Sequence, residues 1–105
     1  MADFAEAFFA DLDSRTNDLR VRFVRGTLRL ECNDGDHEHW IVAFDNGRIS
    51  VSHDDVDADC TVRGDRALMN RIVSGEANPT TAVLRGELNA AGRLELLSYF
   101  RRLLP

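Results

Sequence analysis

Apolar residues recur at helical spacing near both ends of the chain and alternate with polar residues through its middle. Between Asp3 and Asp13 the apolar positions recur along one side of a helix. Asp3 stands where an N-terminal cap is expected, with Glu6 as its capping-box partner, and Asp65 stands at a second such position. The pattern predicts helices over residues 3–13, 65–74, 78–85 and 93–104. Residues 14–25 fit an extended segment or a loop equally well.

The middle of the chain is typical of a β-sheet with one apolar and one polar face. Trp40, Val42 and Phe44 share one face of a predicted strand, and neighbouring segments alternate in the same way. Strands are predicted at residues 27–32, 39–45, 48–53, 60–63 and 87–90. Asn46-Gly47 is a strong hairpin signal between the second and third strands. The order of helices and strands favours a two-layer α+β domain.

Composition and charge narrow the possible functions. A chain of 105 residues, with 44% hydrophobic and 30% charged residues, fits one domain over residues 1–105. Its net charge of −5 argues against nucleic acids as partners and disfavours anionic membranes. No apolar run approaches the ~18 residues that a membrane span needs, and the N-terminus lacks a secretory signal. We therefore expect a cytoplasmic protein without stable membrane insertion, in which Cys32 and Cys60 are free thiols.

The segment Asp34–His39 contains possible metal ligands in the turn between two predicted strands. His37 and His39 share a face if the segment is extended, and Cys32 precedes them. A zinc site needs roughly three or four converging ligands, however, and acidic residues are ordinary in a hairpin turn. A small metal-binding protein is therefore only the third hypothesis, and no resident metal or cofactor is predicted. Since no nucleophile elbow, phosphate loop or dinucleotide fingerprint is present, we do not expect an enzyme.

Residues 75–97 contain the densest run of local signals. Gly75 can adopt the positive φ that ends a helix, and Asn78 can cap the next helix, with Pro79 at its first position. Gly92 marks the turn into the last helix. The spacing within this run is G-E-x-N-P-x-x-A-x-x-x-G-x-L.

Three segments in the first half of the chain form an ordered set together with residues 75–97. They are G-T-L-R-L at residues 26–30, W-I-V-A-F-D-N-G-R-I-S-V-S at 40–52 and A-D-C-T-V-R-G at 58–64. In this order and at these separations the set resembles the sterol carrier protein 2 (SCP2-like) domain family. The resemblance implies a two-layer SCP2-like fold, with helices on one face of a five-stranded sheet of order 3-2-1-4-5. It also implies an apolar tunnel between the layers for a fatty acid, fatty acyl-CoA, sterol or similar lipid.

The resemblance further implies non-enzymatic lipid binding and transport. Because the chain stops soon after the last predicted helix and lacks a peroxisomal signal, a bacterial stand-alone member is expected. A lipid-metabolism enzyme is a possible partner.

Apolar side chains of both layers are the candidates for the tunnel wall. Met69 suits an adaptable wall, because methionine is unbranched and polarisable. The candidates are Trp40, Val42, Phe44 and Leu88 from the sheet, with Leu68, Met69, Ile72, Val83, Leu97 and Phe100 from the helices. The alternative is that they fill a closed core, since protein interiors normally pack without voids. The chain would then be an interaction or accessory module for a lipid-metabolism enzyme.

Overall fold

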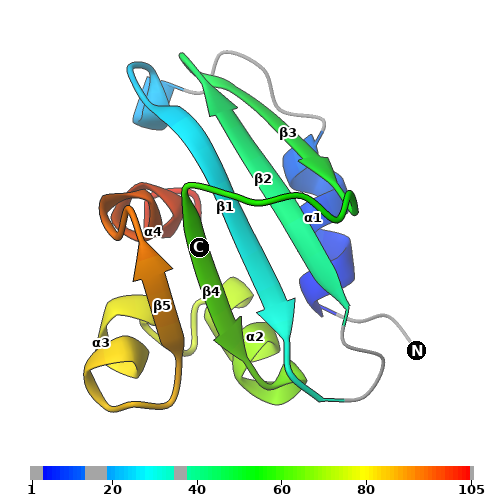
Figure 1. The fold of residues 1–105 in the computed structure, drawn as a ribbon, viewed down its shortest axis with the longest axis vertical. Coiled ribbons are helices and arrows are strands. Elements are labelled where there is room, and N and C mark those ends of the chain that lie inside the picture. Colours follow the sequence, from blue (N-terminus) through cyan, green and yellow to red (C-terminus); the bar gives the residue numbers. More distant parts are fainter. Residues whose placement is uncertain (1–3, 14–18, 35–37, 105) are drawn as a thin grey trace.

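The computed structural model describes residues 4–13, 19–34 and 38–104, with side chains from residue 7 onward. Its strands are β1 (Arg25–Cys32), β2 (His39–Asp45), β3 (Arg48–Ser52), β4 (Cys60–Gly64) and β5 (Asn89–Gly92). Its helices are α1 (Phe4–Asp13), α2 (Arg66–Val73), α3 (Pro79–Leu84) and α4 (Glu95–Arg101), and η1 (Leu19–Val21) is a short 3₁₀ helix. Figure 1 shows the predicted order of helices and strands.

The strands form one sheet in the order β3-β2-β1-β4-β5, which confirms the predicted order. β1 pairs antiparallel with β2 and parallel with β4, so the chain must cross the sheet between β3 and β4. This crossover lies on the face opposite the helices (Figure 1). Hydrogen bonds hold it on β1. The Thr27 N–H donates to Asp59 Oδ2 (3.0 Å), the Asp59 N–H donates to Thr27 Oγ1 (3.1 Å), and Arg29 Nη1 donates to the Val56 carbonyl (2.9 Å).

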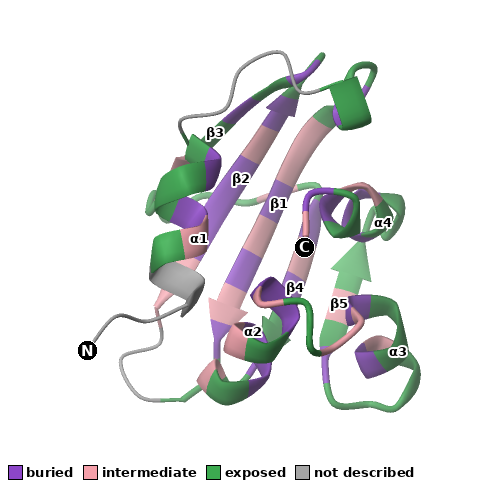
Figure 2. Cartoon of the chain, turned by 180° about the vertical axis from the view of Figure 1, so that it is seen from behind, coloured by how far each residue is buried: buried purple, intermediate pink, exposed green. Residues whose placement is uncertain are grey.

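The core lies between the helices and the inner face of the sheet (Figure 2). Leu28 and Leu30 of the central strand β1 are buried on this face. Leu28 lies beside Val42 and Cys60, and Leu30 beside Trp40 and Val62. The alternation predicted for the middle of the chain therefore produces one continuous apolar layer, which the helices cover.

Side-chain caps begin two of the helices where the sequence predicts them. Asp65 Oδ1 accepts a hydrogen bond of 2.7 Å from the Leu68 N–H and caps α2. Asn78 Oδ1 accepts one of 2.9 Å from the Thr80 N–H, with Pro79 at the start of α3. The predicted cap at Asp3 lies outside the described residues. The two confirmed caps fix the residues at which α2 and α3 begin.

The structure corrects three sequence predictions. β5 spans Asn89–Gly92 rather than residues 87–90: the N–H groups of Glu87 and Leu88 donate to the Ala82 carbonyl in α3, and the strand continues to Gly92, which pairs with Cys60. α4 spans Glu95–Arg101 rather than residues 93–104: at its start the Arg93 N–H donates to the Asp59 carbonyl (2.7 Å), and after its end the Leu103 and Leu104 N–H groups donate to carbonyls three residues back, in a tighter turn. Residues 19–21 are a 3₁₀ helix and are not extended, whereas residues 14–18 lie outside the described part.

Candidate functional site

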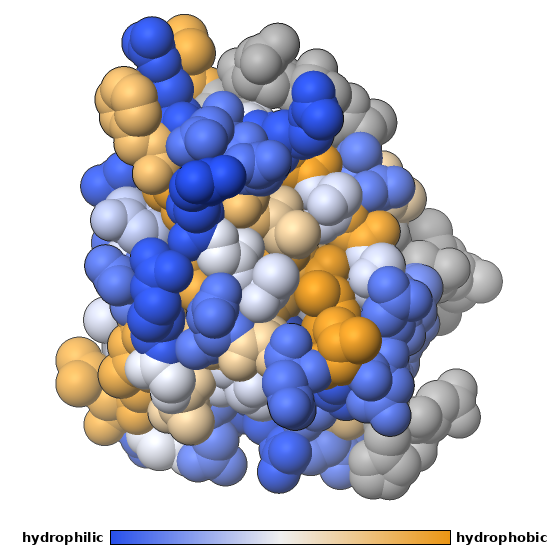
Figure 3. All heavy atoms as spheres, turned by 45° about the horizontal axis from the view of Figure 1, so that its top comes forward, coloured by the Kyte–Doolittle hydropathy of each residue, from blue (hydrophilic) through white to orange (hydrophobic). Residues whose placement is uncertain are grey.

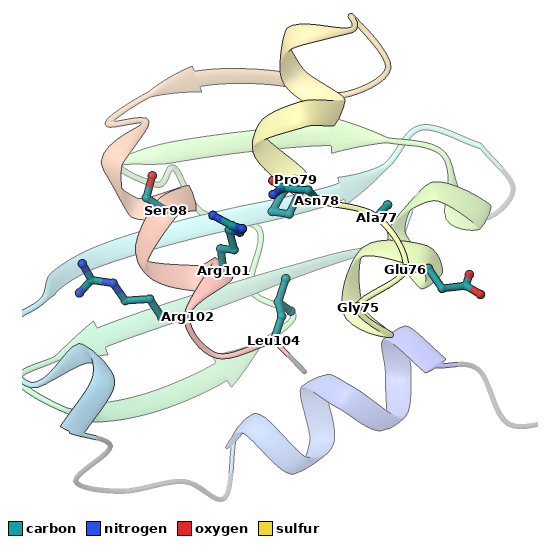
Figure 4. A pocket seen from close by; sticks show the side chains of 9 residues that line it. All are labelled: Gly75, Glu76, Ala77, Asn78, Pro79, Ser98, Arg101, Arg102 and Leu104. Atoms are coloured by element: carbon teal, nitrogen blue, oxygen red, sulfur yellow. The ribbon is translucent and has the colours of Figure 1, made fainter.

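A pocket of about 640 Å³ opens where the α2–α3 connection meets the C-terminal end of α4 (Figure 4). One wall is residues 75–79, and the other is Ser98, Arg101, Arg102 and Leu104. These walls are about twenty residues apart in sequence, so the pocket depends on tertiary packing.

Local backbone signals shape the first wall. Gly75 adopts a φ of 88°, and its N–H donates to the Ile72 carbonyl (3.1 Å). The Ala77 N–H then donates to the Arg71 carbonyl (3.0 Å), which folds the connection back over the end of α2. Pro79 is buried at the start of α3. The helix stop and the helix start predicted in this run therefore bend the chain around the pocket.

The amphipathic pattern of α4 shapes the second wall. Leu96, Leu97 and Phe100 face the core, so that Ser98, Arg101 and Arg102 lie on the exposed side. In Figure 4 the Arg101 side chain points toward Asn78 and Pro79, whereas Glu76 points away from the pocket.

The charge at the pocket is positive although the chain as a whole is acidic. Arg101 and Arg102 bring two guanidinium groups to the lining against the single carboxylate of Glu76. The guanidinium of Arg102 lies 5.0 Å from the centre of the Tyr99 ring. Such an arrangement favours an anionic group at the mouth of the pocket.

The inner side of the pocket adjoins the apolar layer. Ala77 and Leu104 line the pocket, and both are half-buried and packed against the hydrophobic core. A ligand with a charged end and a hydrocarbon end would therefore meet arginines outside and apolar side chains inside.

Nine of the ten predicted wall residues are buried in the core, and Val83 is half-buried against it. None of the ten lines the 640 Å³ pocket. Trp40 lines a second pocket, of about 290 Å³, which lies beside α1 and is also bordered by Phe9, Ala10, Asp13, Val51 and His53. The structure therefore brings the ten residues into one apolar layer, and their role as a lipid-binding wall stays a prediction.

Phe9, Arg101 and Arg102 were not among the predicted site residues. Phe9 stacks on Trp40 with ring centres 4.5 Å apart and is fully buried. Phe9 lies on the apolar side of the first predicted helix, and this position is the sequence signal that could have identified it. Arg101 and Arg102 gave no comparable signal, because arginines on the polar side of a terminal helix are ordinary surface residues.

The structure gives no support to the metal hypothesis within the residues that it describes. There, no three histidine, cysteine or acidic side chains gather closely enough to hold an ion, and His37 lies outside the described residues. Burial raises the pKa of the Cys60 thiol, and it raises that of Cys32 despite an Arg66 Nη1 at 3.8 Å. Both cysteines therefore behave as core side chains with little thiolate character.

Residues 5–105 match the model of the SCP-2 sterol transfer family. The chain belongs to the SCP-2 sterol transfer family. Among curated relatives in this family, sterol carrier protein 2 of Bos taurus is 28% identical over 99 residues. The match covers 88% of this chain but 18% of the Bos taurus protein, so this chain corresponds to a small part of that relative.

Solved SCP2 structures have the same fold. Sterol carrier protein 2 of Aedes aegypti, determined in complex with palmitate, has a TM-score of 0.69 at 20% identity and covers 100% of both chains. The UbiJ-SCP2 ubiquinone synthesis protein has a TM-score of 0.70 at 23% identity, covering 94% of this chain and 90% of that chain. These similarities confirm the predicted SCP2-like α+β fold.

In the described part of the chain, no helix combines the length and the apolar character that crossing a membrane requires.

Proposed function

We propose that this chain is a non-enzymatic carrier that binds one amphipathic lipid with an acidic head group, a fatty acid or a fatty acyl-CoA. The observation that carries the proposal is the position of Arg101 and Arg102 at a pocket whose inner side adjoins the apolar core. The acidic head would lie against these arginines, and the hydrocarbon chain would lie between helices and sheet. The cytoplasm is the expected location.

The apolar layer offers enough binding energy for such a ligand. Covering ~300–400 Å² of lipid surface at ~25 cal/mol/Å² contributes roughly 8–10 kcal/mol. Association and chain ordering oppose binding by several kcal/mol, which leaves micromolar to high-nanomolar affinity. A hydrogen bond from a guanidinium to the acidic head adds to this and orients the lipid.

The hydrocarbon chain has to separate side chains that pack together in this structure. Met69 and Leu97 are buried in the core, and Leu97 lies on α4 between the two layers. Moving α4 slightly outward would open this layer from the pocket side. Met69 can adopt a new rotamer at little cost, because its side chain is unbranched. Membership of a sterol transfer family, and the palmitate complex of the Aedes aegypti protein, support this mode of binding.

Arg101→Glu should weaken binding of a fluorescent fatty acid about tenfold, because it removes a charged hydrogen bond and adds a repulsive charge. Saturable titration followed through Trp40 fluorescence measures the change. Arg85→Glu is the matched control, because Arg85 is exposed after α3 and does not line the pocket. Equal losses in both variants, or undiminished affinity in Arg101→Glu, would contradict the proposed position of the head group.

A second candidate function is an accessory module with a closed core. The packing of nine predicted wall residues into one buried cluster favours it, and so does the likeness to the UbiJ-SCP2 ubiquinone synthesis protein. In that case the chain would act through its surface on a lipid-metabolism enzyme. The two functions differ in a measurable property, because only the carrier binds lipid saturably.

A further inference from the structure

The two edges of the sheet differ in how they are protected. At the β3 edge, the Val51 N–H donates to Asp13 Oδ1 at the end of α1 (2.7 Å), so a side chain occupies a position that an added strand would need. At the other edge β5 pairs with β4, and the described residues place no further strand beside it. Figure 1 shows β5 on the open side of the sheet, with α3 near its start and α4 near its end. Such an edge is a template for pairing with another chain.

The alternation of hydrogen bonds identifies the groups that β5 directs outward. The Arg93 N–H donates to the Asp59 carbonyl, so Arg93 faces β4. Because the direction of the backbone groups alternates along an antiparallel pair, Ala91 also faces β4. Ala90 and Gly92 therefore direct their N–H and C=O groups away from the sheet. These two residues flank Ala91 symmetrically along the strand.

The side chains of β5 leave this edge accessible. The strand reads Asn-Ala-Ala-Gly, without the proline, lysine or other charged residue that protects many exposed edges. Ala91 is exposed, and Ala90 is half-buried against the core. A second strand can therefore approach β5 to the usual spacing of about 4.8 Å without an obstacle in β5 itself.

Two exposed leucines flank the β5 edge. Leu84 at the end of α3 precedes the strand and is 83% exposed, whereas Leu94 follows the strand and is 50% exposed. Figure 3 shows orange apolar spheres protruding at the lower left, over the segment that Figure 1 shows as α3. Antiparallel pairing of two identical strands brings the start of one to the end of the other. A two-fold axis at β5 would therefore bring these leucines together.

We infer that β5 pairs antiparallel with β5 of a second copy of this chain, which makes one continuous sheet across the dimer. With Ala91 opposite Ala91 of the second copy, Ala90 lies opposite Gly92 on both sides of the axis, and each such pair exchanges two hydrogen bonds. Leu84 of each copy lies toward Leu94 of the other. A strand from an unrelated protein would cover the edge but leave both leucines exposed, so a second copy fits this surface better.

The size of this contact sets the expected strength of the dimer. Each copy contributes a strand of 4 residues and two leucines, which is less than the roughly 800 Å² per partner of a stable complex. We therefore expect a reversible dimer with a dissociation constant of about 10–100 μM. None of the residues at this edge lines the 640 Å³ pocket, so dimer formation and lipid binding can be tested separately.

Sedimentation velocity from about 1 μM to about 500 μM protein tests the inference, because the parent should change from monomer to dimer across this range. Ala91→Glu should weaken association at least about tenfold, because it places two carboxylates opposite each other at the axis. Mixing Ala91→Glu with Ala91→Arg should restore the dimer, since opposite charges then face each other. Ala67→Glu is the matched control, because Ala67 is exposed on α2 and the variant has the same change in charge away from the edge.

Leu84→Ala should weaken the dimer about fivefold through lost apolar burial. Leu19→Ala is its control and should associate like the parent, because Leu19 is 76% exposed on η1. Circular dichroism of Ala91→Glu should match the parent, since Ala91 is exposed. A monomer at every concentration overturns the inference and leaves the edge to a strand of another protein. Equal association of Ala91→Glu and the parent, or no dimer in the mixture of the two Ala91 variants, also overturns it.

Discussion

Phe9→Ala should lower the free energy of unfolding by about 3–5 kcal/mol, the usual range for truncating a buried aromatic side chain. The Phe9 side chain is 1% exposed. Its ring stacks on Trp40 at 4.5 Å between centres and lies 6.1 Å from the ring of Phe100. Removing it takes apolar surface from the core and leaves a cavity beneath α1, which neighbouring side chains fill only in part. Urea unfolding followed by Trp40 fluorescence measures the loss.

Phe23→Ala is the control for this prediction. Phe23 is 83% exposed, so the same chemical change should alter the free energy of unfolding by less than about 0.5 kcal/mol. A loss below about 1 kcal/mol in Phe9→Ala, or similar losses in the two variants, would show that α1 is not packed on the sheet as described.

Gly92→Ala should cost roughly 3 kcal/mol or more, enough to threaten folding of a chain of this size. Gly92 ends β5 with a φ of 98°, which side-chain-bearing residues rarely adopt. A Cβ at this position would also collide with the backbone carbonyl oxygen of Asp59. That carbonyl is held in place because it accepts the hydrogen bond from the Arg93 N–H. Strain and collision therefore add at the point where the crossover meets the edge of the sheet.

Gly86→Ala separates the cost of the positive φ from the cost of the steric collision. Gly86 has a φ of 75°, but an added Cβ would have no other atom within 4 Å. We expect a loss of only about 1–2 kcal/mol, the cost of the left-handed backbone alone. Circular dichroism and urea unfolding of both variants would measure the difference. Equal stability of the two variants would contradict the close approach between Gly92 and Asp59.

Most of the fold could be predicted from the sequence, because its signals are local. The alternation around Leu28 and Trp40 identifies the inner face, and Asp65 and Asn78 mark helix starts through caps that form within a few residues. The predicted boundaries of β5 and α4 were wrong, because hydrogen bonds to distant residues or at helix ends determine where these elements begin. The bond from Arg93 to Asp59 is one of these, and nothing in the local pattern indicates it.

The candidate site was harder to predict than the fold. Arg101 and residues 75–79 meet only through tertiary packing, and each looks like ordinary surface in sequence. The tunnel wall poses a different problem, because a wall that admits lipid and a filled core require the same apolar pattern. Met69 is typical of both. Family membership therefore supports a lipid-binding interior more strongly than the residue pattern does.

Native mass spectrometry of the purified chain mixed with palmitate would show whether the chain binds a lipid as a carrier does. The carrier function predicts a one-to-one complex that saturates at micromolar ligand. It also predicts that Met69→Trp, which adds volume inside the apolar layer, loses the complex while keeping its circular dichroism spectrum. A bare protein mass at every concentration of palmitate, and likewise with acyl-CoA, would contradict the carrier function and favour the accessory module.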